Sequence, residues 1–158
     1  MKVLLSNAPW YKIDTKSKTG LLGCRAGSRW PHMRDYKGKM ISRYQPFPFF
    51  IATASSMLKN AGFEVILRDS IVIGETYEEY YRFVEEVKPD FIILGGDNCD
   101  HNSVSDKEKL KAYLDTVTYP MESRKIPWAH VFGNHDHDIE LDDVEKTMLY
   151  ENYPYCIS

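Results

Sequence analysis

Four short apolar runs, separated by longer segments, set the pattern of this chain. They cover residues 2–5, 63–67, 91–94 and 126–132, and their lengths suit β-strands. The run 91–94, Phe-Ile-Ile-Leu, is apolar at every position, as in a central strand of a parallel sheet that is covered on both faces. The pattern therefore predicts four strands, with 91–94 inside the sheet.

Helices are predicted in two of the segments between these strands. The first begins after the prolines at positions 46 and 48 and ends at Gly62. The second begins at the capping box Thr76 and Glu79 and runs to about residue 87. Pro89 keeps Lys88 out of the right-handed helical region, so this helix should end there.

Two further helices are predicted in the second half. A capping box of Ser105 and Glu108 begins a helix over residues 106–124, with an apolar stripe on one face. Pro120 should kink this helix or end its regular part. A short acidic helix over residues 142–149 follows the last strand.

The alternation of strand and helix predicts the fold class. Four strands joined by helical crossovers give an α/β fold with a doubly wound, mainly parallel sheet of about four strands and helices on both faces. The 158 residues suit a single domain covering the whole chain, 1–158. Residues 10–45 show no period, so we expect a long loop that is functional or is ordered by a missing partner.

Charge concentrates in this loop. It holds nine Lys and Arg but two acidic residues, whereas the whole chain carries a net charge of −3. That net charge is too small to indicate a nucleic-acid partner. Arg25 and Arg29 lie among Gly20, Gly23 and Gly27, and guanidinium groups with backbone amides suit a phosphate or carboxylate. An ordinary solvated basic loop explains the same residues.

The cysteines bear on the compartment. Cys24, Cys99 and Cys156 form no CxxC pair and no even disulfide framework, which favours a reducing environment. No signal peptide and no apolar run of membrane-spanning length is visible. We expect a cytoplasmic protein without a membrane partner.

Two strand-end loops carry candidate chemistry. Gly-Gly-Asp97-Asn98 follows the third strand, and Gly-Asn134-His135-Asp136 follows the fourth. Ligands of open α/β sheets bind at the carboxyl ends of strands, so neighbouring strands would bring Asp97 and Asn134 together. A carboxylate can bridge two divalent cations, an amide oxygen adds a neutral ligand, and a histidine can donate a proton. Acidic, His-bearing loops are also commonly just exposed to solvent.

These loops resemble the GD and GNH signatures of the calcineurin-like metallophosphoesterases. PDFIILGGDN, RKIPWAHVFGNHD and YPYCIS extend the resemblance over residues 76–158, towards the purple-acid-phosphatase-like branch. The resemblance implies that Asp97 is the bridging ligand of a divalent metal (Mn, Fe or Zn), Asn134 a ligand of the second metal, and His135 the catalytic histidine. The substrate would be a phosphate ester or another small anion.

The sequence departs from this family at two places. The family has an Asp-x-His after its first strand, where this chain has Ser6-Asn7-Ala8-Pro9, and a later Gly-His-x-His loop is absent. A two-metal site without these ligands should bind metal weakly, with a single ion as one alternative. Efficient hydrolysis is not expected.

The first half resembles a different family. MKVLLSNAPW, RAGSRWPH and PFPFF are similar to the cobalamin-binding domain that precedes radical S-adenosylmethionine enzymes, over residues 1–94. The resemblance implies a Rossmann-like sheet with a corrinoid over its carboxyl edge. The residues that it places at that edge are Asn7, Trp10, Arg25, Ser28, Arg29 and Asp69. The cobalamin-ligating Asp-x-His-x-x-Gly motif is absent, as is the radical domain, so a separate partner domain would be needed.

The two resemblances overlap near residues 88–94, which suggests a composite chain. Three interpretations follow from the sequence. The first is a metallophosphoesterase-like metal-binding domain with weak or no hydrolysis. The second is a cobalamin-binding module, and the third is a folded chimera without activity.

Overall fold

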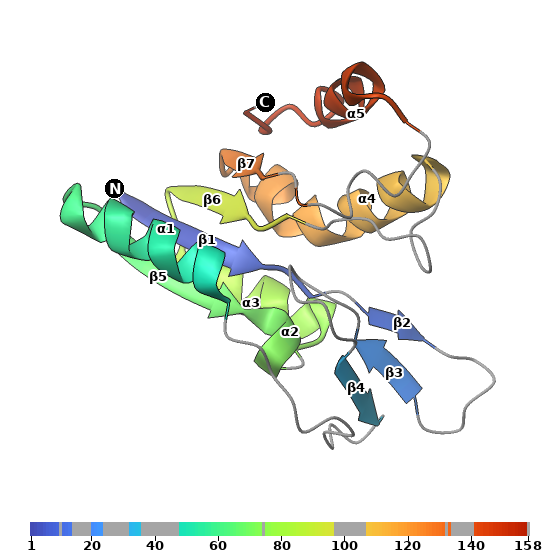
Figure 1. Cartoon of the computed structure of the whole chain (residues 1–158), viewed down its shortest axis with the longest axis horizontal. Helices are drawn as coiled ribbons and strands as arrows, with labels where there is room; N and C mark the ends of the chain where they lie inside the picture. The colour runs from blue at the N-terminus through green and yellow to red at the C-terminus, as the bar shows by residue number, and fades with distance from the viewer. Residues whose placement is uncertain are drawn as a thin grey trace.

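The computed structural model describes residues 1–9, 11–13, 20–23, 32–35, 48–73, 75–96, 107–131, 133 and 141–157. Within them, four parallel strands form the main sheet, in the order β5-β1-β6-β7. The strands are β1 (Lys2–Asn7), β5 (Glu64–Asp69), β6 (Phe91–Leu94) and β7 (Trp128–His130). The predicted four-stranded parallel α/β sheet is confirmed (Figure 1).

The strand β6 joins the two halves of the chain. It pairs with β1 on one side and with β7 on the other. The residues at which the two sequence resemblances overlap therefore lie inside one continuous sheet. From β1 the chain crosses to β5 on one side, and from β5 it crosses back past β1 to β6 on the other side. The direction of the connections therefore reverses between the neighbouring strands β1 and β6. Ligands of open α/β sheets bind at such a reversal.

Five helices are described: α1 (Phe49–Asn60), α2 (Ser70–Ile73), α3 (Tyr77–Val87), α4 (Lys107–Arg124) and α5 (Asp143–Tyr150). The four predicted helices are confirmed to within a few residues, whereas the single turn of α2 was not predicted. The α3 capping box forms as expected, with both hydrogen bonds present between Thr76 and Glu79. Lys88 leaves the helix in the left-handed region, at φ 49°.

A second capping box, which sequence analysis missed, begins α5. The Asp142 carboxylate accepts a hydrogen bond from the backbone N–H of Glu145 at 2.8 Å, and the Glu145 carboxylate accepts one from the N–H of Asp142 at 3.2 Å. The pattern D-x-x-E satisfies the first orphan amides of the helix in the same way as T-x-x-E.

The two faces of the sheet are covered differently. Helices α3, α4 and α5 pack on one face, and Figure 1 shows α1 lying over β1 and β5 on the other. The main core lies between the sheet and α3, α4 and α5. Its buried members include Leu4, Tyr80, Val84, Ile92, Leu94, Leu114, Val117, Met121, Trp128 and Tyr150.

Pro120 lies inside α4 and does not end it, contrary to one of the two expected outcomes. Proline has no N–H, so the Thr116 carbonyl one turn earlier loses its usual donor. The structure supplies a substitute from the neighbouring helix: the Tyr81 hydroxyl of α3 donates a hydrogen bond to that carbonyl. The carbonyl thus keeps a donor, and α4 continues to Arg124.

We expect Tyr81→Phe to lower the free energy of unfolding by about 1 kcal/mol, or somewhat more, because the Thr116 carbonyl would lose this donor. Urea unfolding followed by circular dichroism measures the change. Introducing Pro120→Ala into the Tyr81→Phe background restores a backbone donor and should recover part of the loss. Equal stability of Tyr81→Phe and the parent chain would contradict this role of the hydroxyl.

The segment 10–45 contains more regular structure than its sequence indicated. Three short strands, β2 (Tyr11–Ile13), β3 (Gly20–Gly23) and β4 (His32–Asp35), form an antiparallel sheet in the order β2-β3-β4. Strands of three or four residues are too short to produce a readable alternation of polar and apolar positions, and the segment was therefore interpreted as a loop.

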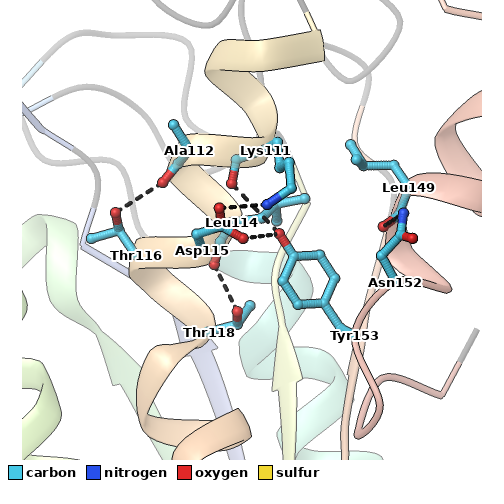
Figure 2. Close-up of polar contacts among 9 residues, drawn as sticks. All are labelled: Lys111, Ala112, Leu114, Asp115, Thr116, Thr118, Leu149, Asn152 and Tyr153. Carbon is cyan, nitrogen blue, oxygen red and sulfur yellow. Dashed lines mark hydrogen bonds and ion pairs between the residues drawn. The ribbon is translucent and has the colours of Figure 1, made fainter.

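The C-terminal segment is fixed to the edge strand and to α4. Cys156 forms a parallel bridge with Trp128, and the Trp128 indole N–H donates to the Glu122 carboxylate at 2.7 Å. Figure 2 shows the Tyr153 hydroxyl donating to Asp115, at 2.8 Å. Partial burial raises the pKa of Asp115, but hydrogen bonds from Lys111 and Tyr153 outweigh this and hold the pKa below its usual value.

Of the helices in the described part of the chain, none combines the length and apolar character that crossing a membrane requires. The cytoplasmic location stays a prediction.

Candidate metal site at the carboxyl edge of the sheet

The carboxyl ends of the four strands meet along one edge. Asn7 at the end of β1 is in register with Asp69 at the end of β5. On the other side of β1, Ser6 pairs with Leu94, and Leu94 pairs with His130 of β7. The third and fourth strands are therefore neighbours, which was the condition for bringing Asp97 and Asn134 together, and the two candidate loops leave the sheet from adjacent strands.

The first described residues of these loops touch each other. A Cβ atom added to Gly96 would lie 2.4 Å from the Gly133 nitrogen, 2.7 Å from its Cα and 2.8 Å from the Val131 carbonyl oxygen. All three are backbone atoms, so no side-chain rotation relieves such a contact. Glycine at position 96 is thus required by the approach of the second loop, and the contact fixes where both loops begin.

The predicted metal and catalytic residues come next in the chain. Asp97 follows Gly96, and Asn134 and His135 follow Gly133. These three residues lie outside the described residues, so their roles stay predictions. Among the residues that the structure does describe, no group of three or more His, Cys, Asp or Glu side chains is placed to hold a metal ion.

Asn7 reaches from β1 to the start of the first loop. Its side chain is buried, with 6% of the residue exposed, and its Oδ1 atom occupies the space beside Gly95. A Cβ atom at Gly95 would lie 2.2 Å from that oxygen. The Gly95 amide in turn donates to the Ser6 carbonyl at 2.8 Å, so β1 holds this turn through both backbone and side chain.

His130 lies at the end of β7, three residues before Gly133, and sequence analysis did not single it out. Its ring stacks on the Tyr150 ring of α5, with centroids 3.5 Å apart and an interplanar angle of 6°. Burial lowers the pKa of His130 from 6.5 to about 4. The ring is therefore neutral at neutral pH, and its stacking ties the end of β7 to α5.

This burial predicts a pH dependence of stability. The unfolded chain binds a proton at His130 near pH 6.5, whereas the folded chain binds it only near pH 4. Between these values the unfolded state holds more protons, so stability should fall as the pH is lowered, by up to about 1.4 kcal/mol per pH unit. Denaturation of the parent chain and His130→Phe at pH 7, 6 and 5 measures this contribution. Phenylalanine keeps a flat ring against Tyr150, and parallel pH profiles for the two chains would contradict the prediction.

A buried ion pair fixes the end of β5. The Arg68 guanidinium donates two hydrogen bonds to the Glu75 carboxylate, whose side chain is 2% exposed, and lies 4.1 Å from the centre of the Phe83 ring. Tyr80 is fully buried nearby, and burial raises the pKa of its hydroxyl, with the Ser6 hydroxyl opposing the shift. This cluster was not predicted, because Arg68 and Glu75 meet only after α2 turns the chain back.

The six residues assigned to a corrinoid site divide into two groups. Asn7 and Asp69 lie together at the carboxyl edge, where the resemblance placed them. Trp10, Arg25, Ser28 and Arg29 lie outside the described residues. No ligand role of any of the six is tested by this arrangement.

Comparison with known proteins identifies the family of the second half. The model of the calcineurin-like phosphoesterases matches residues 73–157, just over half of the chain. The chain belongs to the calcineurin-like phosphoesterase family. The match includes the strands β6 and β7, the contact between Gly96 and Gly133 and both candidate loops, and it lends no support to the cobalamin-binding resemblance of residues 1–94.

Two curated relatives share this region in part. The chain is 38% identical over 79 residues to a probable inactive purple acid phosphatase 28 of Arabidopsis thaliana, covering 49% of this chain and 19% of the relative. It is 32% identical over 80 residues to the phosphatase DCR2 of Saccharomyces cerevisiae, covering 48% of this chain and 13% of that protein. The chain thus spans a fifth or less of the length of either relative. No solved structure matches the chain.

Proposed function

We propose that this chain is a metal-binding calcineurin-like phosphoesterase domain with an incomplete two-metal site, and that it hydrolyses phosphate esters weakly or not at all. The observation that carries the proposal is the backbone contact between Gly96 and Gly133. It holds together the first residues of the two loops, and in the sequence Asp97 follows Gly96 while Asn134 and His135 follow Gly133. The family in general uses divalent metal ions.

The residue types suit such an ion. The Asp97 carboxylate would be the main ligand, and the Asn134 amide oxygen would add a neutral one. Hard divalent cations prefer oxygen ligands, and an ion bound here would stabilise negative charge on a phosphoryl oxygen. His135 would hold or donate a proton at the leaving oxygen of a phosphate ester.

The proposed weakness follows from the ligands at the end of β1. The Asp-x-His of the family is replaced by Ser6-Asn7-Ala8-Pro9, which supplies neither a carboxylate nor an imidazole. Fewer charged ligands mean lower affinity and a poorer chance of holding two ions. One of the curated relatives is itself named a probable inactive phosphatase.

The test is a calorimetric titration of Mn²⁺ into metal-free protein, with Asp97→Ala, Asn134→Ala and the control Glu86→Ala alongside. We expect saturable binding by the parent chain and Glu86→Ala, since Glu86 is an exposed carboxylate on α3. Asp97→Ala should abolish binding, and Asn134→Ala should weaken it less because a neutral ligand is lost. Unchanged affinity in Asp97→Ala would overturn the assignment.

Binding and unfolding measurements also distinguish the two alternative functions. A cobalamin-binding module would give the absorbance bands of a retained corrinoid after incubation with cobalamin and removal of the unbound cofactor. A folded chimera without activity would bind neither Mn²⁺ nor cobalamin and would still unfold cooperatively. The pairing of Asn7 with Asp69 at the carboxyl edge is compatible with the first of these alternatives but is explained equally by the sheet register.

A further inference from the structure

We propose that Asn7 is a positioning residue for the loop after β6 that carries Asp97. The strand β1, which lies outside the family match, would then influence metal binding at the loops after β6 and β7. The inference rests on the proposed function and adds to it a residue from the first half of the chain. The matched family region begins at residue 73. Asn7 reaches the site only because β1 pairs directly with β6.

The first step in the argument is that Gly95 and Asn7 occupy complementary space. Gly62 is the only glycine with positive φ among the described residues, so the backbone conformation at Gly95 does not itself require glycine. The requirement is steric: the Asn7 Oδ1 atom lies 2.2 Å from where a Cβ would be, and its Cγ lies 3.4 Å away. Glycine at position 95 thus makes room for the side chain of Asn7.

The second step is that Asn7 has little freedom to move elsewhere. The residue is 6% exposed, and its backbone is paired with Asp69 on one side of β1. The methyl group Cγ2 of Ile51 on α1 lies 3.7 Å from the same Cβ position and closes the space from the helix side. The buried amide of Asn7 therefore packs against Gly95 and restricts how the backbone there can move.

The third step connects the contact between Asn7 and Gly95 to the proposed metal ligand, Asp97. Gly95 is two residues before Asp97, and Gly96 between them already touches the Gly133 backbone. The turn is therefore held from both sides, by Asn7 from β1 and by Gly133 from the second loop. Neighbouring residues hold a metal ligand in the orientation that binding requires, and loss of such a neighbour typically lowers metal affinity by about 10- to 100-fold.

The experiment compares Mn²⁺ affinity and thermal stability in Asn7→Ala, Asn7→Asp, Gly95→Ala and the double variant Asn7→Ala/Gly95→Ala. We expect Asn7→Ala to weaken Mn²⁺ binding by about 10-fold or more. Asn7→Asp keeps the oxygen in place and should bind Mn²⁺ at least as well as the parent chain. Gly95→Ala displaces Asn7 and should resemble Asn7→Ala, whereas the double variant should be no worse than either single variant.

Stability separates positioning from a merely structural role. If Asn7 only filled space, Asn7→Ala would lower the melting temperature while the folded protein bound Mn²⁺ with the affinity of the parent chain, and this result would overturn the proposal. Additive losses of affinity in the double variant would also overturn it, because residues that act through one contact are not additive.

A metal-free readout distinguishes failure of this inference from failure of the proposed function. The backbone amide signals of Gly95 and Gly96 are compared by NMR in the metal-free parent chain and in Asn7→Ala, with Gly62 as the remote control. If the parent chain binds no Mn²⁺, the proposed function fails. Signals that shift in Asn7→Ala at Gly95 and Gly96 but not at Gly62 would still support Asn7 as the positioning residue of this turn. Unchanged signals at both glycines would overturn it.

Discussion

Replacing Trp128 by alanine should cost about 4 kcal/mol of folding free energy, a large fraction of the stability of an ordinary domain. Trp128 is fully buried in β7, and its ring meets those of Tyr150 and Tyr153 edge-on, at centroid distances of 6.3 and 5.8 Å. The substitution removes this packing and leaves the Glu122 carboxylate without the indole donor. Alanine would also leave a large cavity between β7 and α5.

Urea unfolding followed by circular dichroism measures this loss. Trp128→Phe keeps an aromatic ring and should retain more stability than Trp128→Ala, which makes it the variant of choice if the alanine protein does not fold. Tyr119→Ala removes another large aromatic side chain, but one that is 56% exposed, and should cost much less. If Trp128→Ala lowers the free energy of unfolding no more than Tyr119→Ala does, the packing around Trp128 does not stabilise the fold as expected.

The second large effect is expected at Gly96. In Gly96→Ala the new Cβ would meet backbone atoms of Gly133 at 2.4 and 2.7 Å, so the ends of β6 and β7 must separate. Overpacking of this kind costs about 1–3 kcal/mol and sometimes more. Because the same movement parts the two candidate loops, Mn²⁺ affinity should fall together with stability.

Gly62→Ala is the matched control for this prediction. A Cβ at Gly62 would have nothing within 4 Å, but the residue has a φ of 89°, so alanine there is strained without any collision. We expect Gly62→Ala to lose stability and to keep its affinity for Mn²⁺. Equal affinities in Gly96→Ala and Gly62→Ala would contradict the view that the glycine contact assembles the site.

Sequence analysis predicted the sheet well because its signals are local. The run 91–94 is short and wholly apolar, and the structure places it between two other strands. Capping boxes such as Thr76 with Glu79 are also complete within four residues, and the one at α3 forms both hydrogen bonds. The helix over residues 142–149 was predicted as well, and the same rule applied to Asp142 and Glu145 would have given the reason for its start.

Contacts between distant residues were not predictable in this way. The donation from Tyr81 to the Thr116 carbonyl explains how Pro120 is tolerated, but the two residues are 35 positions apart. The fit of Asn7 beside Gly95 depends on β1 pairing with β6, which the order of the strands along the chain does not reveal. Glycine at position 95 leaves space for the side chain of Asn7, a reason that the neighbouring sequence does not show.

Of the candidate site, the structure describes where the two loops begin, whereas the roles of Asp97, Asn134 and His135 stay predictions. The strands β6 and β7, which lead into the two loops, are neighbours, and the family match covers both loops. The first half of the chain was interpreted from a second resemblance, and the structure places its first strand within the same sheet. At the end of β1, Asn7 from the first half of the chain therefore lies beside Gly95 from the second half.

The most direct measurement locates bound Mn²⁺ by NMR of the parent chain. Paramagnetic Mn²⁺ broadens the signals of nearby amides, so substoichiometric Mn²⁺ should first broaden Asn7, Gly96 and Gly133, which lie at the carboxyl edge. Gly62 and Glu64, at the opposite end of β5, should stay sharp, and Asp97→Ala should remove the effect. Broadening that spares Gly96 and Gly133, or that persists in Asp97→Ala, would contradict a metal site at the loops after β6 and β7.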